Sequence, residues 1–134
     1  MTKDQKQFRG LILADLNIAK DYMDSDNKQM RLMAAYHIQQ AVEKIIKLKA
    51  EIKGIDYLWG HNLIKLLQEC DRLGIDLKEP KLIRKNARMY TSWEADCRYY
   101  PQKIVRKDSI RYAYEACVEW LNSGDTYINS RRKQ

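Results

Sequence analysis

Apolar residues recur along nearly the whole chain at the three- and four-residue spacing of an amphipathic helix. Only 5 glycines and 2 prolines interrupt its 134 residues, which argues against a turn-rich β fold and against disordered linkers. A chain of this length forms one domain with its own core. The pattern therefore predicts an all-α fold, namely an antiparallel up-and-down bundle of four to five helices.

Helix-starting and helix-ending residues set approximate bounds for these helices. The expected ranges are about 4–23, 30–52, 63–73, 80–93 and 108–122. Asp26, with Gln29 three residues later, resembles a capping box in front of the second helix. Gly54 and Gly74 are placed to end the second and third helices in the left-handed conformation.

Two prolines mark the later boundaries. Pro80 suits the first turn of the fourth helix, and Pro101 breaks the chain, so that residues 97–103 are expected to form a connection. We therefore expect one domain over residues 1–134, with a core at about 4–123 and a basic C-terminal tail at 124–134.

Cysteine and histidine usage argues against a metal or cofactor site. Cys70, Cys97 and Cys117 are odd in number and lack C-x-x-C spacing, as expected for small apolar residues in a cytoplasmic protein. His37 and His61 are the only histidines, and no Gly-rich phosphate loop or serine elbow occurs. A mean hydropathy of -0.67 and the lack of a long uncharged apolar run exclude a membrane span.

The formal net charge of +7 is concentrated in one segment. Residues 81–111 hold nine basic and three acidic side chains. Such a cluster indicates an acidic partner, such as nucleotide phosphate, RNA or an acidic protein surface, although a solvated helix face is the alternative. Tyr90 and Trp93 lie within the segment at a spacing that predicts core positions. The candidate basic patch consists of Arg84, Lys85, Arg88, Arg106 and Lys107.

A polar stripe adjoins the apolar face of the second predicted helix. His37, Gln40, Lys44 and Lys47 follow one another at spacings of three and four residues, which places them along one side of the helix. The stripe either flanks the core and bonds to neighbouring helices or lines a groove for a phosphate or a base edge. The residues alone leave both interpretations open.

Three short motifs occur in the order and at the spacing of one known family. They are His37-x-x-Gln40-Ala41-x-Glu43-Lys44, His61-x-Leu63-x-x-Leu66 and Arg98-Tyr99-Tyr100-Pro101. Over about residues 8–122 the chain thereby resembles the HEPN domain family, whose name stands for higher eukaryotes and prokaryotes nucleotide-binding. The family usually ends its fourth helix in R-Y-P, whereas an extra tyrosine gives R-Y-Y-P here.

The resemblance implies a helical bundle that dimerises and is encoded beside, or fused to, a minimal nucleotidyltransferase in bacteria and archaea. It also implies nucleotide binding or, in some branches, metal-independent RNA cleavage. In the expected groove, Lys44 and Arg98 would meet phosphate, His37 and Gln40 would offer hydrogen bonds, and Tyr99 would stack. The candidate ligand-binding residues are His37, Gln40, Lys44, His61, Arg98 and Tyr99.

The RNA-cleaving branches carry an R-x4-6-H motif near the start of the last helix, where this chain has no histidine. Arg31 and His37 match the motif only formally, because they lie in the second predicted helix and six residues apart, roughly 120° around it. The main hypothesis is therefore a non-catalytic, cytoplasmic, homodimeric module that binds nucleotide beside a nucleotidyltransferase. The alternatives are a metal-independent RNase toxin of a toxin–antitoxin pair and a purely structural protein-interaction domain.

Overall fold

The computed structural model describes residues 1–129, which form six α-helices and one 3-10 turn without any strand. They are α1 (Lys3–Tyr22), α2 (Lys28–Ile52), α3 (Leu63–Arg72), α4 (Lys81–Lys85), α5 (Ala87–Tyr99), α6 (Lys107–Leu121) and the turn η1 (Gly124–Thr126). The predicted all-α helical bundle is confirmed. Among these residues, every helix is too short or too polar to span a bilayer.

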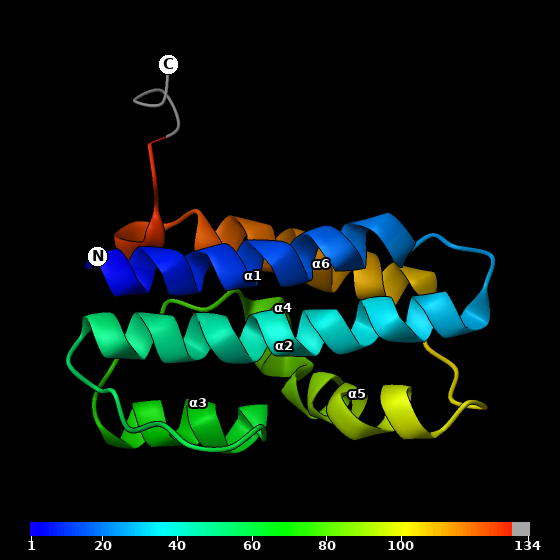
Figure 1. Ribbon diagram of the computed structural model, residues 1–134. Coiled ribbons are helices and arrows are strands. Elements are labelled where there is room, and N and C mark those ends of the chain that lie inside the picture. Colours follow the sequence, from blue (N-terminus) through cyan, green and yellow to red (C-terminus); the bar gives the residue numbers. More distant parts are fainter. Residues whose placement is uncertain (130–134) are drawn as a thin grey trace.

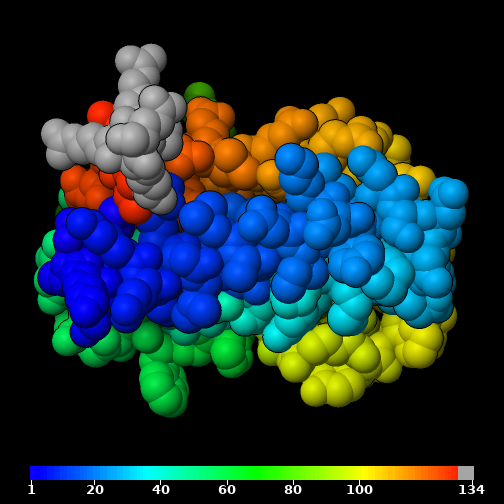
Figure 2. Space-filling model, turned by 45° about the horizontal axis from the view of Figure 1, so that its top comes forward, coloured from blue at the N-terminus to red at the C-terminus, as the bar shows by residue number. Residues whose placement is uncertain are grey.

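The longest helix, α2, forms the centre of the bundle. Helix α1 runs antiparallel along one side of it and α6 packs against both, while α3 and α5 cover the opposite side (Figure 1). The space-filling view shows α1 (blue) lying over α2, flanked by α6 on one side and by α3 and α5 on the other (Figure 2). Because α2 buries 13 of its 25 residues, its buried polar side chains require partners inside the protein.

The residue that caps the N-terminus of α2 lies one position later than the sequence indicates. The Asn27 side chain accepts a hydrogen bond from the Met30 backbone N–H at 3.1 Å and is the N-cap. The predicted capping box of Asp26 and Gln29 is therefore wrong. Asp26 instead lies outside the helix, with its carboxylate 3.6 Å from the Lys107 ammonium.

Glycine ends α2 and α3 as predicted. Gly54 and Gly74 adopt φ of 91° and 74°, the left-handed region that other residues rarely enter. After α2, the Ile55 N–H donates to the Ala50 carbonyl at 3.0 Å and the Gly54 N–H donates to the Glu51 carbonyl at 2.9 Å, so carbonyls of the last helical turn are paired. These endings turn the chain sharply and allow the α2–α3 loop to fold back over α2.

The fourth predicted helix is two helices, separated at Asn86. The Asn86 amide donates to the Leu82 carbonyl oxygen at 3.1 Å, the kind of local bond by which asparagine competes with a regular helix. Helix α5 then continues to Tyr99, so the connection predicted for residues 97–103 begins later than expected. Pro80 stands at the N-cap position of α4.

The aromatic and cysteine predictions for the core are confirmed. Tyr90 and Trp93 are each 1% exposed, with ring centroids 5.0 Å apart. Cys70, Cys97 and Cys117 are free and buried, and burial raises the pKa of Cys97 and Cys117 to about 12. Thiols in this state pack as small apolar groups and are poor nucleophiles.

Two buried cations join the end of α6 to α1 and α2. The Lys49 ammonium donates to the Ser123 carbonyl at 3.1 Å and to the Thr126 hydroxyl at 2.9 Å. The Arg9 guanidinium donates to the Thr126 carbonyl at 2.8 Å. Both cations lie at the negative end of the α6 dipole, which favours positive charge. Residues 124–126 of the predicted tail are thus packed on the bundle, and residues 130–134 of that tail lie outside the described residues.

The buried Lys49 leads us to expect a free energy of unfolding that rises with pH. Burial lowers the pKa of Lys49 from 10.5 to about 8. Between these two pH values the unfolded chain keeps the proton on Lys49 and the folded chain has lost it, so the free energy of unfolding increases as pH rises through this window. Relative to Lys49→Met, the native chain is expected to gain about 2 kcal/mol of unfolding free energy between about pH 7.5 and about pH 10. Urea denaturation of both proteins measures this, and a constant difference across the window would contradict it.

Candidate functional site

A buried carboxylate on α1 pairs with two side chains of α2. Asp15 is 7% exposed, and its two oxygens lie 2.8 Å from His37 Nδ1 and 2.5 Å from Lys44 Nζ. His37 and Lys44 are seven residues apart, two helical turns, and therefore face α1 together. Their side chains remain 23% and 24% exposed, so the ion pair reaches the surface along the α1–α2 contact.

A second buried carboxylate, Glu43 on α2, repeats this arrangement with one lysine of α2 and a histidine of the α2–α3 loop. The Glu43 oxygens lie 2.7 Å from His61 Nδ1 and 3.0 Å from Lys47 Nζ, and Gln39 Nε2 donates to Glu43 at 3.2 Å. Burial raises the pKa of Glu43, but the hydrogen bonds from His61, Lys47 and Gln39 outweigh it and hold that pKa below its usual value. Glu43 is thus a carboxylate at neutral pH that anchors one histidine and one lysine.

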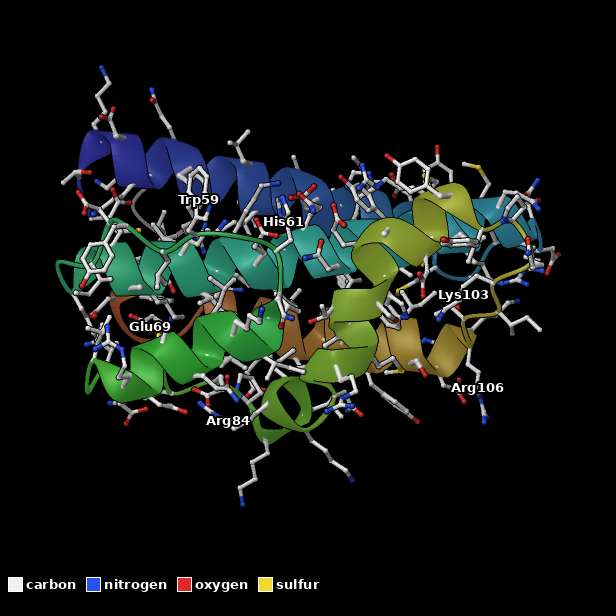
Figure 3. All side chains as sticks on the ribbon, turned by 90° about the horizontal axis from the view of Figure 1, so that it is seen from below. Trp59, His61, Glu69, Arg84, Lys103 and Arg106 are labelled. Carbon is white, nitrogen blue, oxygen red and sulfur yellow. The ribbon has the colours of Figure 1, made fainter. Side chains whose placement is uncertain are left out.

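Two glutamines extend these contacts along α2. Gln40 Nε2 donates to Gln39 Oε1 at 2.7 Å, and Gln39 Nε2 also donates to the His61 carbonyl at 3.3 Å. The fully buried Gln39 thereby fixes the end of the α2–α3 loop against α2. Figure 3 shows the His61 side chain standing over α2 at this place.

The end of α5 adjoins His37 through an aromatic ring. The Arg98 guanidinium carbon lies 4.9 Å from the centroids of both Tyr36 and Tyr99, in cation–π contact with each. The Tyr36 ring in turn meets the His37 ring edge-on, with centroids 5.1 Å apart. Arg98 is oriented further by bonds to the Glu94 carbonyl and carboxylate at 2.7 and 2.6 Å.

The cations keep hydrogen-bonding capacity after these contacts. Lys44 and Lys47 each use one of three ammonium donors, and Arg98 uses two of its five. In each histidine the carboxylate holds Nδ1, which leaves Nε2 for another partner. We call this set of side chains the polar seam. Its members are Asp15, His37, Gln40, Glu43, Lys44, Lys47, His61 and Arg98.

The structure brings most of the predicted ligand-binding residues together. His37 and Lys44 share Asp15, His61 binds Glu43, and Gln40 joins them through Gln39. Arg98 and the 66% exposed Tyr99 adjoin this set through Tyr36. Their roles toward a ligand stay predictions.

Sequence reasoning missed the two carboxylates that organise the site. Asp15 interrupts the apolar stretch of the first helix, and a single acid at a core-facing position is a signal that could have found it. Glu43 belongs to the family motif, yet its spacing alone does not show that it is buried. Nothing in the sequence indicated Tyr36, because its ring contacts Arg98, which is far away along the chain.

Arg31 and His37, the formal match to a cleavage motif, have separate partners. The Arg31 guanidinium donates to the Ser25 carbonyl at 2.7 Å and so closes the α1–α2 loop. His37 faces α1 and pairs with Asp15. The hypothesis that the two side chains cleave RNA together stays a prediction.

The basic run of residues 81–111 is partly neutralised by acids from elsewhere in the chain. Arg84 pairs with Asp71 and Glu79, and Lys107 lies 3.6 Å from Asp26. Within the described residues, no carboxylate pairs with the remaining candidates, Lys85, Arg88 and Arg106. Figure 3 shows Arg84 beside α4 and Arg106 before α6, well apart, so the run supplies cations at separate places.

Neither histidine belongs to a metal-type cluster. Within residues 1–129, no three or more His, Cys, Asp or Glu side chains are arranged as metal ligands. Each histidine has one carboxylate neighbour and one nearby ammonium, and an ammonium opposes a bound cation.

Comparison with known proteins gives one match. The family model described as HEPN domain matches residues 13–123, which include every member of the polar seam. The searches of curated proteins and of solved structures found no match.

Proposed function

The chain belongs to the HEPN domain family, and we propose that it is a non-catalytic module that binds a nucleotide or RNA at the polar seam. One observation carries the proposal. Two buried carboxylates, Asp15 and Glu43, each hold a histidine and a lysine in place, so that ammonium and imidazole groups are fixed before any ligand arrives. Fixed donors lose little conformational entropy on binding, which favours affinity for phosphate.

Each side chain has a role in this proposal. The free donors of Lys44 and Arg98 bind phosphate oxygens, because charge-assisted bonds are the strongest available to an anion. His37 and Gln40 supply further hydrogen bonds, and His61 does so from the loop side. Tyr99, already stacked on Arg98 and 66% exposed, offers its ring to a base.

The proposal extends to assembly and partner. We infer a cytoplasmic homodimer that acts with a minimal nucleotidyltransferase, as the family resemblance implies. Cations without a carboxylate neighbour in the described residues, such as Lys85 and Arg88, suit an acidic surface on that partner. The competing hypothesis is a structural domain that binds a partner protein and no nucleotide.

Replacing Lys44 and Arg98 together with glutamine is expected to abolish nucleotide-induced thermal stabilisation. Glutamine keeps hydrogen-bonding groups beside Asp15 and Glu94 but removes both charges that meet phosphate. Melting of the native and variant chains, each with and without a panel of nucleotides at low salt, measures the effect. At a ligand concentration about 100 times Kd, the native chain gains about 2.7 kcal/mol.

A matched control is Lys20→Gln with Arg72→Gln, which removes the same charge from exposed helix positions outside the polar seam. This control should keep the full shift. A shift retained by the Lys44/Arg98 variant would place the ligand elsewhere. If neither nucleotides nor RNA stabilise the native chain, the nucleotide-binding function is wrong and the structural-interaction alternative replaces it.

A further inference from the structure

The outward face of α1 carries no charge over its central turns. Between Lys6 and Lys20 the only charged side chains are Arg9 and Asp15, and both are buried. The exposed residues of this stretch are Gln7, Gly10, Leu11, Leu13, Ala14 and Asn17. In a chain that is 32% charged, a surface helix is expected to present charged side chains to water. Helix α6 does so, with exposed carboxylates at Asp108, Glu115 and Glu119.

Two leucines stand on this neutral face. Leu11 is 55% exposed and Leu13 is 39% exposed, one on each flank of the line through Gly10 and Ala14. A glycine inside a helix costs stability relative to alanine, and a Cβ built on Gly10 would meet no packing neighbour within 4 Å. Figure 2 shows α1 (blue) crossing the front of the molecule. Packing within the described chain therefore explains neither the exposed leucines nor the glycine.

Opposite charges stand at the two ends of this face. Lys3 and Asp21 are both exposed and lie 18 residues apart, which is five turns of 3.6 residues. Their side chains therefore project from the same side of α1, in line with Gly10 and Ala14. Within residues 1–129, neither Lys3 nor Asp21 has an oppositely charged group within ion-pair distance. Both charges are thus available to a partner.

The face is complementary to itself. When two copies of α1 pack antiparallel about a two-fold axis between Gly10 and Ala14, Lys3 of each copy meets Asp21 of the other. The same axis brings each Leu11 beside the Leu11 of the other copy, because residues close to the axis meet their own counterparts. A parallel pairing would instead set Lys3 against Lys3 and Asp21 against Asp21, and like charges repel. The charges therefore favour one occupant, a second copy, in one orientation.

We propose that α1 is the interface of a homodimer in which the two copies of this helix pack antiparallel. This inference rests on the homodimer of the proposed function and adds its contact face. The leucines supply the apolar centre, and the exposed end charges orient the pair more than they stabilise it. Because α1 has 20 residues, the contact is about 30 Å long and small for a specific interface, so the dimer dissociates on dilution.

Sedimentation velocity over a wide range of protein concentrations tests the apolar centre. Leu11→Glu places two carboxylates side by side across the axis and should weaken dimerisation about ten-fold or more. Because Leu11 is exposed, the variant should keep the helical circular dichroism spectrum of the native chain. Tyr112→Glu is the matched control, since it adds the same charge at a position on α6 that is 56% exposed and should leave dimerisation unchanged.

A charge exchange tests the orientation. Lys3→Glu alone sets two acids together at each end of the interface, and Asp21→Lys alone sets two lysines together, so each should weaken dimerisation. The double variant restores opposite charges at both ends and should recover the dimerisation of the native chain. Both substitutions suit the dipole of α1, with an acid in its first turn and a base in its last, so the monomer should stay folded.

The outcomes separate this interface from the proposed function. A native dimer that Leu11→Glu leaves intact would overturn the α1 interface and leave a homodimer that uses another face. A double charge variant that dimerises no better than the single variants would overturn the antiparallel pairing. A native chain that stays monomeric at every concentration would overturn both the interface and the homodimer, whereas nucleotide-induced stabilisation tests the polar seam separately.

Discussion

Replacing Asp15 with alanine is expected to lower the unfolding free energy by about 3 kcal/mol and to abolish nucleotide-induced stabilisation. Asp15 is 7% exposed and is the carboxylate that pairs with both His37 and Lys44. Without it, a lysine and a histidine about three-quarters buried lose their hydrogen-bonding partner. The same loss frees Lys44 to move away from the position in which it would meet phosphate.

Urea denaturation and nucleotide-dependent melting measure the two effects of Asp15→Ala. Asp21→Ala is a suitable control, because Asp21 lies exposed on the same helix and its removal should change stability by less than about 0.5 kcal/mol. Asp15→Asn keeps one acceptor oxygen, so its loss of unfolding free energy should lie between those of Asp15→Ala and Asp21→Ala. A loss below about 1 kcal/mol for Asp15→Ala would mean that water replaces the carboxylate and that the pair is not a structural anchor.

Replacing Trp120 with alanine is expected to be the most destabilising change, costing about 4 kcal/mol or more. Trp120 is 1% exposed, and its indole N–H donates to the Leu77 carbonyl at 3.0 Å, which ties α6 to the loop before α4. The variant therefore creates a cavity and leaves a buried carbonyl without its donor. A loss of this size is a large fraction of the stability of a small domain.

Trp59→Ala provides the matched control for this second prediction, because it removes the same side chain from a position that is 93% exposed. It should leave the unfolding free energy nearly unchanged. Trp120→Phe keeps most of the apolar volume and should cost about 1 to 2 kcal/mol, mainly through the lost bond to Leu77. Equal urea midpoints for Trp120→Ala and Trp59→Ala would contradict the role of Trp120 in the core.

The helices were predictable because their signals are local. Apolar spacing marks the buried face of each helix, and Gly54 and Gly74 end two of them for a conformational reason that acts within a few residues. The break at Asn86 was not predicted, because the regular apolar pattern continues across it. It depends on a single hydrogen bond that the Asn86 side chain donates to the Leu82 carbonyl. The capping box failed by one residue for a similar reason, since Asp26 and Asn27 are both good caps.

The polar stripe of α2 and its family motif already indicated His37, Gln40 and Lys44, since helical spacing alone places them on one side. Their charge state and orientation were not contained in that spacing. Asp15 lies 22 residues before His37, and only the packing of α1 on α2 brings the two within 2.8 Å. His61 reaches Glu43 because the loop after α2 folds back.

Net charge likewise separates what the sequence determines from what the tertiary structure determines. The sequence by itself determined that the chain is basic, that residues 81–111 hold most of the excess, and that the chain folds into a helical bundle. The tertiary structure decided which of those charges remain without a partner, since Arg84 and Arg111 pair with acids from distant segments. Periodicity and composition are properties of neighbouring residues, whereas a site is made by side chains that meet only after the helices pack.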